Sequence, residues 1–209
     1  MAKVKKAFFC QSCGAQNPQW QGQCNACKAW NTLVEEIIEK ETPKEWVSDA
    51  SQQNILPIPI NAIDVTQTPR IKTKDEELNR VLGGGLVPGS VILLGGEPGI
   101  GKSTLLLQVS LSLNTNVLYI SGEESQQQIK LRADRMDLSG ENCFVLSQTE
   151  TQKIFQQIQK IKPDLLIVDS IQTIHSNHIE SGAGSVSQIR ATAGELIQFA
   201  KNTNTPVIL

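Results

Sequence analysis

Residues 96–103 are Gly-Glu-Pro-Gly-Ile-Gly-Lys-Ser, and this stretch decides the fold. It fits the phosphate-loop pattern G-x-x-x-x-G-K-[ST] without a mismatch. The glycines let backbone N–H groups surround a phosphate, and a helix that starts here points its N-terminus at that phosphate. We expect Lys102 to reach the β- and γ-phosphates of ATP and Ser103 to hold Mg²⁺. The predicted nucleotide-binding residues are Gly96, Glu97, Pro98, Gly99, Ile100, Gly101, Lys102, Ser103 and Thr104.

Strand-like and helix-like segments alternate around this loop. Continuous apolar runs predict strands at 91–94, 117–120, 143–146 and 165–168. Helices are predicted at 75–82, 102–113, from Ser125 onward, at 154–161 and at 186–200. Unbroken apolar strands that alternate with helices imply a parallel sheet covered on both faces. The predicted fold class is therefore α/β, a P-loop NTPase core with a mostly parallel sheet.

Acidic side chains follow two of the predicted strands. Asp169 ends the run 165–168, on what we expect to be a strand neighbouring the phosphate-loop strand, and would support the Mg²⁺ shell. Glu123 and Glu124 follow the strand 117–120. ATP hydrolysis needs a carboxylate that orients and deprotonates the attacking water. We predict Glu123 in this role, with Lys102 as the second catalytic residue. Two alternatives stay open: Glu124 is the base instead, or each glutamate is only a solvated acid at the start of a helix.

Four of the five cysteines form two pairs with metal-ligand spacing, Cys10-x-x-Cys13 and Cys24-x-x-Cys27. In a cytosolic chain such pairs indicate zinc rather than disulfides, with chance pairing or a redox dithiol as the alternative. Four thiolates fill a tetrahedral Zn²⁺ shell and leave no position for water, so we expect a structural zinc. Cys143 lies in an apolar stretch and is interpreted as a buried small hydrophobe.

Composition changes twice along the 209 residues. Residues 1–30 carry basic and no acidic side chains, and an acidic passage then leads into a polar, proline-bearing segment. We therefore place a zinc ribbon at 1–35, a linker and lead-in segment at 36–69 and the ATPase core at 70–209. The final apolar run, 206–209, predicts a strand cut part-way, which would leave the core incomplete and a sheet edge unpaired.

The charge is nearly balanced, with 19 basic and 21 acidic residues. This balance argues against a polyanion-binding tail but allows a local basic patch. No apolar run approaches the roughly 20 residues needed to cross a bilayer. The basic N-terminus also lacks the apolar segment of a secretory signal. We therefore expect a cytoplasmic protein that does not bind membranes.

Nearly the whole chain resembles one protein family. The four cysteines, with WQGQC at 20–24 and AWNTLVEE at 29–36, are similar to the zinc module of the bacterial RadA (Sms) family. The stretches LGGGLVPGS at 82–90 and YISGEES at 119–125, with the phosphate loop, resemble the RecA-like ATPase core of that family. The resemblance places Glu123 at the position of the catalytic glutamate and identifies the chain as an amino-terminal fragment.

This resemblance implies an ATP-driven, DNA-stimulated motor. It would promote branch migration and the processing of recombination intermediates in DNA repair and homologous recombination. The implied cofactors are ATP, Mg²⁺ and structural Zn²⁺. The implied partners are single-stranded and branched DNA, further copies in a homo-hexamer of the full-length protein, and recombinase or replication proteins.

The chain departs from the family in several places. Lys74 and Asn79 replace the usual glycine and aspartate, away from the nucleotide positions. The Lys-Asn-Arg-Phe-Gly motif and the Lon-protease-like domain of the family are missing, so activity of the fragment alone stays open. Two other functions also stay open: a RecA-like signalling ATPase of the clock-protein type, and a non-hydrolysing nucleotide switch whose zinc module binds a partner.

The segment 170–185, after Asp169, resembles the first DNA-facing loop of RecA-like cores. It is polar and contains glycines, and Arg190 adds a charge nearby. An ordinary surface loop is the alternative. No acidic or cysteine neighbour completes a metal site with His175 and His178, so we do not expect them to bind a metal.

Overall fold

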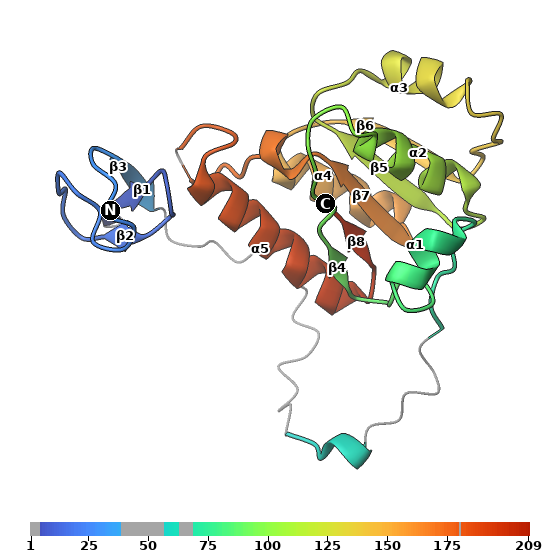
Figure 1. The fold of residues 1–209 in the computed structure, drawn as a ribbon, viewed down its shortest axis with the longest axis horizontal. Helices are drawn as coiled ribbons and strands as arrows, with labels where there is room; N and C mark the ends of the chain where they lie inside the picture. Colours follow the sequence, from blue (N-terminus) through green and yellow to red (C-terminus); the bar gives the residue numbers. More distant parts are fainter. Residues whose placement is uncertain (1–4, 39–56, 63–68, 180) are drawn as a thin grey trace.

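The computed structural model describes residues 5–38, 57–62, 69–179 and 181–209. These residues form a small three-stranded sheet at the N-terminus and a larger part in which helices flank a five-stranded sheet (Figure 1). Much of the predicted linker 36–69 lies outside the described residues, and the proposed domain boundaries stay a prediction.

The N-terminal sheet is antiparallel. Its central strand β1 (Lys5–Cys10) pairs with β2 (Gln16–Asn17) on one side and β3 (Leu33–Ile38) on the other. The core of this sheet consists of Cys10, Cys24 and Leu33, with Phe8 and Ala15 packed against them. So small a core buries too little apolar surface to fold alone, and units of this size usually need a metal or another cross-link.

The larger sheet is parallel, in the order β4-β8-β7-β5-β6. Its strands are β4 (Val91–Ile92), β5 (Val117–Ser121), β6 (Cys143–Ser147), β7 (Leu165–Asp169) and β8 (Val207–Ile208). The parallel α/β core predicted from the alternating pattern is confirmed.

Helices cover both faces of this sheet (Figure 1). They are α1 (Glu76–Val81), α2 (Lys102–Ser112), α3 (Gln126–Ala133), α4 (Thr151–Ile161) and α5 (Val186–Thr203), with short 3₁₀ turns η1 (Ile60–Ala62) and η2 (Ile171–Thr173). Successive residues of a strand point to opposite faces. Leu118 and Ile120 therefore pack in the cluster with α4 and α5, whereas Val117 and Tyr119 pack in the cluster with α2 and α3.

The position of β8 corrects two expectations. We expected the last strand to leave an unpaired edge, but β8 lies inside the sheet, where Val207 pairs with Val91 of β4 and with Leu166 of β7. Val207 and Ile208 are accordingly buried. We also expected Asp169 on a strand next to the phosphate-loop strand, but β8 separates β7 from β4. Strand order depends on contacts that are remote in sequence, so the local pattern does not reveal it.

The helix after Glu123 and Glu124 begins where the sequence predicts. The side chain of Ser125 accepts a hydrogen bond from the backbone N–H of Gln128 at 3.3 Å, and Gln128 Oε1 accepts one from the N–H of Ser125 at 2.8 Å. This reciprocal capping box satisfies two backbone donors that the helix itself leaves unpaired. It therefore fixes the direction in which the chain leaves β5 and passes the two glutamates.

Candidate nucleotide site and metal centre

The phosphate loop connects β4 to α2. Gly99 and Gly101 adopt left-handed backbone conformations, with φ of 80° and 103°. No heavy atom lies within 4 Å of a Cβ built at either position. Backbone conformation rather than crowding therefore requires glycine here. Gly101 is also the N-cap of α2, so the first backbone N–H groups of that helix face the loop.

Lys102 folds back over the phosphate loop. Its Nζ donates hydrogen bonds to the carbonyl oxygens of Gly96 and Glu97, both at 2.8 Å. The ammonium group thus lies inside the curve of the loop, where phosphate oxygens would compete with these carbonyls for its protons. Ser103 and Thr104 follow on the first turn of α2. The donors present fit a nucleotide phosphate, for which Lys102 would supply the charge, and Ser103 would supply a hydroxyl for Mg²⁺.

Asp169 ends β7 and is held by a residue of the neighbouring strand. The hydroxyl of Tyr119, on β5, donates a hydrogen bond to Asp169 Oδ2 at 2.6 Å. Burial, followed by the contact with Asp169, raises the pKa of the Tyr119 hydroxyl far above its usual value. The phenol therefore stays protonated and donates to the carboxylate throughout the neutral range. One oxygen of Asp169 is fixed in this way.

The two glutamates after β5 have different surroundings. Glu124 Oε1 accepts a hydrogen bond from Arg132 Nη1 at 2.7 Å, and its other oxygen is buried without a partner. Glu123 is exposed, and Ser170 Oγ donates to its Oε1 over 3.4 Å. Glu124 is thus engaged in an ion pair, whereas Glu123 has a carboxylate that points into solvent beside the end of β7. The geometry favours Glu123 as the residue that can reach a water molecule.

A close approach of the Gly122 backbone to the side chain of Thr173 brings Glu123 next to the end of β7. A Cβ at Gly122 would lie 2.0 Å from Thr173 Oγ1 in η2, far inside van der Waals contact. Thr173 Oγ1 in turn donates to the carbonyl of Ser170 at 2.8 Å. Only a residue without a side chain allows this packing. The turn after β5 and the segment after β7 are therefore held together directly beside Asp169.

Parallel strands place all these groups at one edge of the sheet. The phosphate loop follows β4, Glu123 follows β5 and Asp169 ends β7, and the carboxyl ends of parallel strands meet at the same edge. The predicted site residues thus share the edge at which α/β proteins bind ligands. Sequence reasoning missed Tyr119 and Arg132. The signal for Tyr119 was a phenol hydroxyl within the apolar run 117–120, whereas Arg132 gave no signal in the sequence.

The four paired cysteines converge in the N-terminal sheet. Their sulfur atoms all lie within 4.8 Å of one another, with Cys10 Sγ 3.6 Å from Cys27 Sγ and Cys13 Sγ 3.7 Å from Cys24 Sγ. The hydroxyl of Thr32, 3.1 Å from Cys10 Sγ, lowers the pKa of that thiol to about 6. Four converging sulfurs fit a closed tetrahedral Zn²⁺ site with a structural role.

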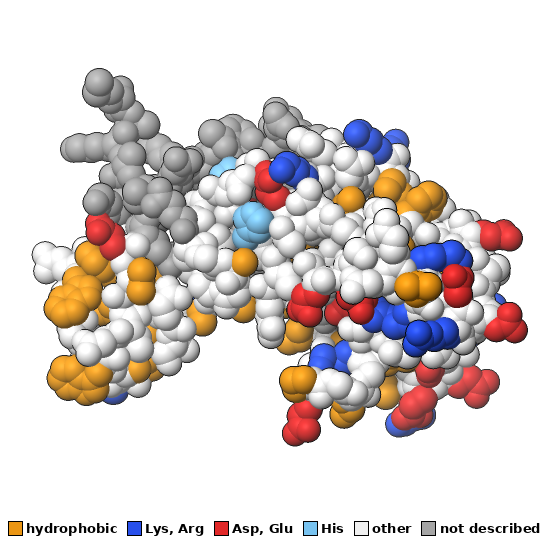
Figure 2. All heavy atoms as spheres, turned by 90° about the horizontal axis from the view of Figure 1, so that it is seen from above, with side chains coloured by type: hydrophobic (Ala, Val, Ile, Leu, Met, Phe, Trp, Pro, Cys, Tyr) orange, Lys and Arg blue, Asp and Glu red, His pale blue; other side chains and the backbone are white. Residues whose placement is uncertain are grey.

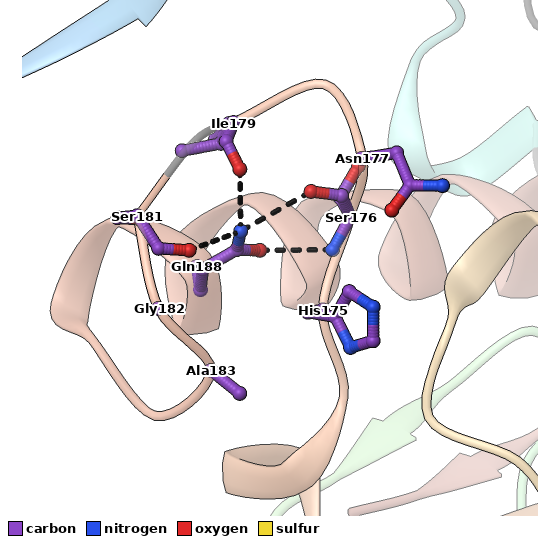
Figure 3. Close-up of a pocket in the computed structure, with 8 residues that line it drawn as sticks. All are labelled: His175, Ser176, Asn177, Ile179, Ser181, Gly182, Ala183 and Gln188. Atoms are coloured by element: carbon purple, nitrogen blue, oxygen red, sulfur yellow. Dashed lines mark hydrogen bonds between the residues drawn. The ribbon is translucent and has the colours of Figure 1, made fainter.

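The segment after β7 is organised by one buried side chain (Figure 3). Gln188, on the first turn of α5, is 1% exposed and donates through Nε2 to the carbonyls of Ser176, Ile179 and Ser181 at 3.1, 2.7 and 2.9 Å. Its Oε1 accepts from the N–H of Ser176 at 2.8 Å. Residues 176–179 and 181 therefore lie around Gln188, beside a hollow of about 440 Å³. Sequence reasoning missed this residue as well.

Arg190 lies on α5 near the same segment. Its Nη1 donates to the carbonyl oxygen of Gly14 in the zinc ribbon at 2.8 Å. In the space-filling view, the basic and acidic side chains of the α/β part are interspersed, and hydrophobic side chains gather on the ribbon (Figure 2). Trp20 and Trp30 of the ribbon are 58% and 69% exposed.

Comparison with protein families agrees with this geometry. Residues 57–209 match the AAA domain family, and residues 8–35 match the rubredoxin metal binding domain. The chain therefore belongs to the AAA domain family and carries a four-cysteine zinc ribbon ahead of that domain. ATP and Mg²⁺ are the cofactors that this family implies, and the ribbon fits Zn²⁺.

The resemblance to the RadA family is confirmed by individual relatives. The chain is 49% identical over 214 residues to the DNA repair protein RadA of Bacillus subtilis, a match that covers 100% of this chain and 47% of that protein. It is 50% identical over 206 residues to RadA of Streptococcus pyogenes serotype M1, covering 98% of this chain and 45% of the relative. It is 48% identical over 202 residues to RadA of Chlamydia trachomatis serovar D, a match that covers 95% of this chain and 44% of that protein.

The chain spans about half the length of these relatives. Among the helices that the structure describes, none is long and apolar enough to cross a membrane.

Proposed function

We propose that the chain is the nucleotide-binding part of a DNA-dependent ATPase that acts in DNA repair and homologous recombination. The observation that carries the proposal is the contrast between the two glutamates. Glu124 is tied to Arg132, while Glu123 is exposed beside Asp169 and Ser170. A site that only bound nucleotide would not need an accessible carboxylate at this place. The names of the relatives support the role in DNA repair.

In the proposed mechanism, each residue has a separate task. The phosphate loop and the start of α2 bind the phosphates through backbone N–H groups, and Lys102 leaves the carbonyls of Gly96 and Glu97 to neutralise the terminal phosphates. Ser103 and Asp169 would hold Mg²⁺, which supplies positive charge to the phosphates when bound. Tyr119 keeps Asp169 in place for this task.

Glu123 is proposed to orient the attacking water and take its proton. General-base catalysis requires a carboxylate within hydrogen-bond reach of the water. Glu123 Oε1 has only a long contact, 3.4 Å, with Ser170 among the described residues, so a water molecule can replace that contact at little cost. Glu124 would have to leave Arg132 before it could act.

The proposed action on DNA, the oligomeric state and the partners rest on the relationship to the RadA proteins. We propose that ATP hydrolysis drives branch migration and the processing of recombination intermediates, with single-stranded and branched DNA as partners. The full-length protein is proposed to act as a homo-hexamer in the cytoplasm, with recombinase or replication proteins as further partners. The segment 170–185 is the proposed DNA contact of this part of the chain, and Gln188 holds its carbonyls at residues 176, 179 and 181.

Steady-state ATP turnover of the full-length protein, with and without single-stranded DNA, tests the proposal against its alternatives. Turnover that DNA increases supports the DNA-dependent ATPase. Turnover that is indifferent to DNA would favour a RecA-like signalling ATPase, and nucleotide binding without turnover would favour a switch.

A further inference from the structure

The zinc ribbon and the α/β part meet at one defined contact. Arg190 Nη1, on α5, donates a hydrogen bond to the carbonyl oxygen of Gly14 at 2.8 Å, although the two residues are 176 positions apart. The ribbon lies beside the N-terminal end of α5 in Figure 1. A charged donor on a backbone carbonyl is among the stronger hydrogen bonds in proteins.

The fit around Gly14 is close. A Cβ at this position would lie 2.7 Å from Val186 Cγ1 and 2.9 Å from Arg190 Nη1. Gly14 is buried and has a φ of 71°, a conformation that favours glycine on its own account. The backbone of the ribbon therefore packs directly on side chains of the first two turns of α5, with no side chain between them.

On the ribbon, Gly14 belongs to the turn that presents two of the zinc ligands. Its N–H donates to the carbonyl of Cys10 at 2.7 Å, and the N–H of Cys10 donates to the carbonyl of Ala15 at 3.0 Å. The turn that orients the thiols of Cys10 and Cys13 thus also orients the carbonyl of Gly14 toward Arg190. The shape that α5 contacts exists only while this turn is folded.

On the α/β part, the contact falls on the turn of α5 that organises the segment after β7. Val186 is the first residue of α5, and Gln188, two residues before Arg190, holds the carbonyls of residues 176, 179 and 181. A ribbon attached at Val186 and Arg190 is therefore attached to the same helical turn as that segment.

From these contacts we propose that Arg190 and Val186 form a docking surface for the zinc ribbon of the same chain, and that this surface recognises the metal-loaded turn around Gly14. Docking couples zinc binding to the start of α5. Because whatever binds only the folded ribbon stabilises it, docking also slows the loss of zinc. The proposal does not depend on the proposed ATPase function.

Hydrogen exchange in the zinc-loaded full chain tests the docking. We expect Arg190→Ala to raise amide exchange severalfold in the peptides that cover residues 11–15 and 186–192. Lys201→Ala, which removes an exposed cation from the last turn of the same helix, is the matched control and should leave both peptides unchanged. Alanine is a good helix former, so neither variant should unfold α5. Unchanged exchange in Arg190→Ala would overturn the proposal.

Zinc release gives a second, independent readout. With a chromogenic chelator in excess, Arg190→Ala should lose zinc roughly fivefold faster than the wild type, as expected for the loss of one hydrogen bond of about 1 kcal/mol. Arg190→Lys keeps a charged donor, so its rate of zinc release should lie between those of the wild type and Arg190→Ala. Equal release rates in the wild type, Arg190→Ala and Lys201→Ala would show that the ribbon does not depend on α5 and would contradict the docking.

Discussion

Tyr119 and Asp169 are joined by a 2.6 Å hydrogen bond between the phenol hydroxyl and Oδ2. The two residues lie on adjacent parallel strands, β5 and β7, in which Ser121 pairs with Asp169. Tyr119 is two residues before Ser121 and therefore points to the same face of the sheet. A buried phenol thus orients the carboxylate that we propose for Mg²⁺.

Tyr119→Phe should weaken the binding of Mg²⁺ at Asp169 without disturbing the packing of the core. The ring stays and only the donor is lost, so we expect the free energy of unfolding to fall by about 1 kcal/mol. Asp169 becomes free to rotate, and the Mg²⁺ concentration needed for half-maximal ATP hydrolysis should rise severalfold in the full-length protein. Nucleotide binding in the absence of Mg²⁺ serves as the control and should not change. An unaltered Mg²⁺ dependence would show that the hydrogen bond has no role in positioning.

Arg132→Ala should destabilise the protein through Glu124. The variant leaves a half-buried carboxylate without its partner, which typically costs about 1–3 kcal/mol. Glu124→Gln in the same background removes that stranded charge, so the double variant should recover part of the loss. Urea unfolding of the four proteins in this cycle measures the coupling. Strictly additive losses would mean that the ion pair contributes nothing.

Gly122→Ala should be among the most damaging single substitutions in the α/β part. The new Cβ would meet Thr173 Oγ1 at 2.0 Å, so either the turn before Glu123 or η2 must move. We expect a loss of stability of about 1–3 kcal/mol, together with reduced hydrolysis. Gly194→Ala is the matched control, because no heavy atom lies within 4 Å of its Cβ position inside α5. That change should stabilise the protein by about 0.5–1 kcal/mol. Equal effects of both substitutions would refute the close approach.

Thiol chemistry should separate Cys143 from the four zinc ligands. Burial raises the pKa of the Cys143 thiol to about 11, so only about 0.1% of it is ionised at pH 8. After zinc removal we expect four thiols to react quickly with a disulfide reagent and the fifth to react slowly. In urea all five should react at similar rates. Cys143, which we expected to be buried, is only partly buried in the structure. Rapid reaction of five thiols in the folded protein would contradict even this partial burial.

Sequence reasoning captured those features that are encoded locally. Three such features are the phosphate loop, the cysteine spacing and the capping box of Ser125 and Gln128. Each depends on residues a few positions apart, and the residue types themselves indicate the chemistry. The predicted strands and helices follow from periodicity for the same reason. These are the features in which the predicted elements and the structure agree.

Features that depend on distant contacts were missed or mistaken. The position of β8 between β4 and β7 depends on pairing with strands more than 30 residues away. The hydrogen bond from Arg190 to the carbonyl of Gly14 joins residues 176 positions apart and was not foreseen, while the suggested part of Arg190 in DNA contact stays a prediction. The roles of Tyr119, Arg132 and Gln188 likewise exist only once the strands and helices are assembled. No local pattern distinguishes such residues from ordinary core or surface positions.

The central claim is that Glu123, rather than Glu124, activates the water that attacks ATP. Single-turnover hydrolysis of bound ATP by full-length Glu123→Gln and Glu124→Gln, each with single-stranded DNA present, tests it most directly. We predict that Glu123→Gln binds ATP as the wild type does but loses hydrolysis by at least about a hundredfold. Glu124→Gln should retain most of the activity. Near-normal hydrolysis in Glu123→Gln, with loss in Glu124→Gln, would contradict the account and assign the base to Glu124.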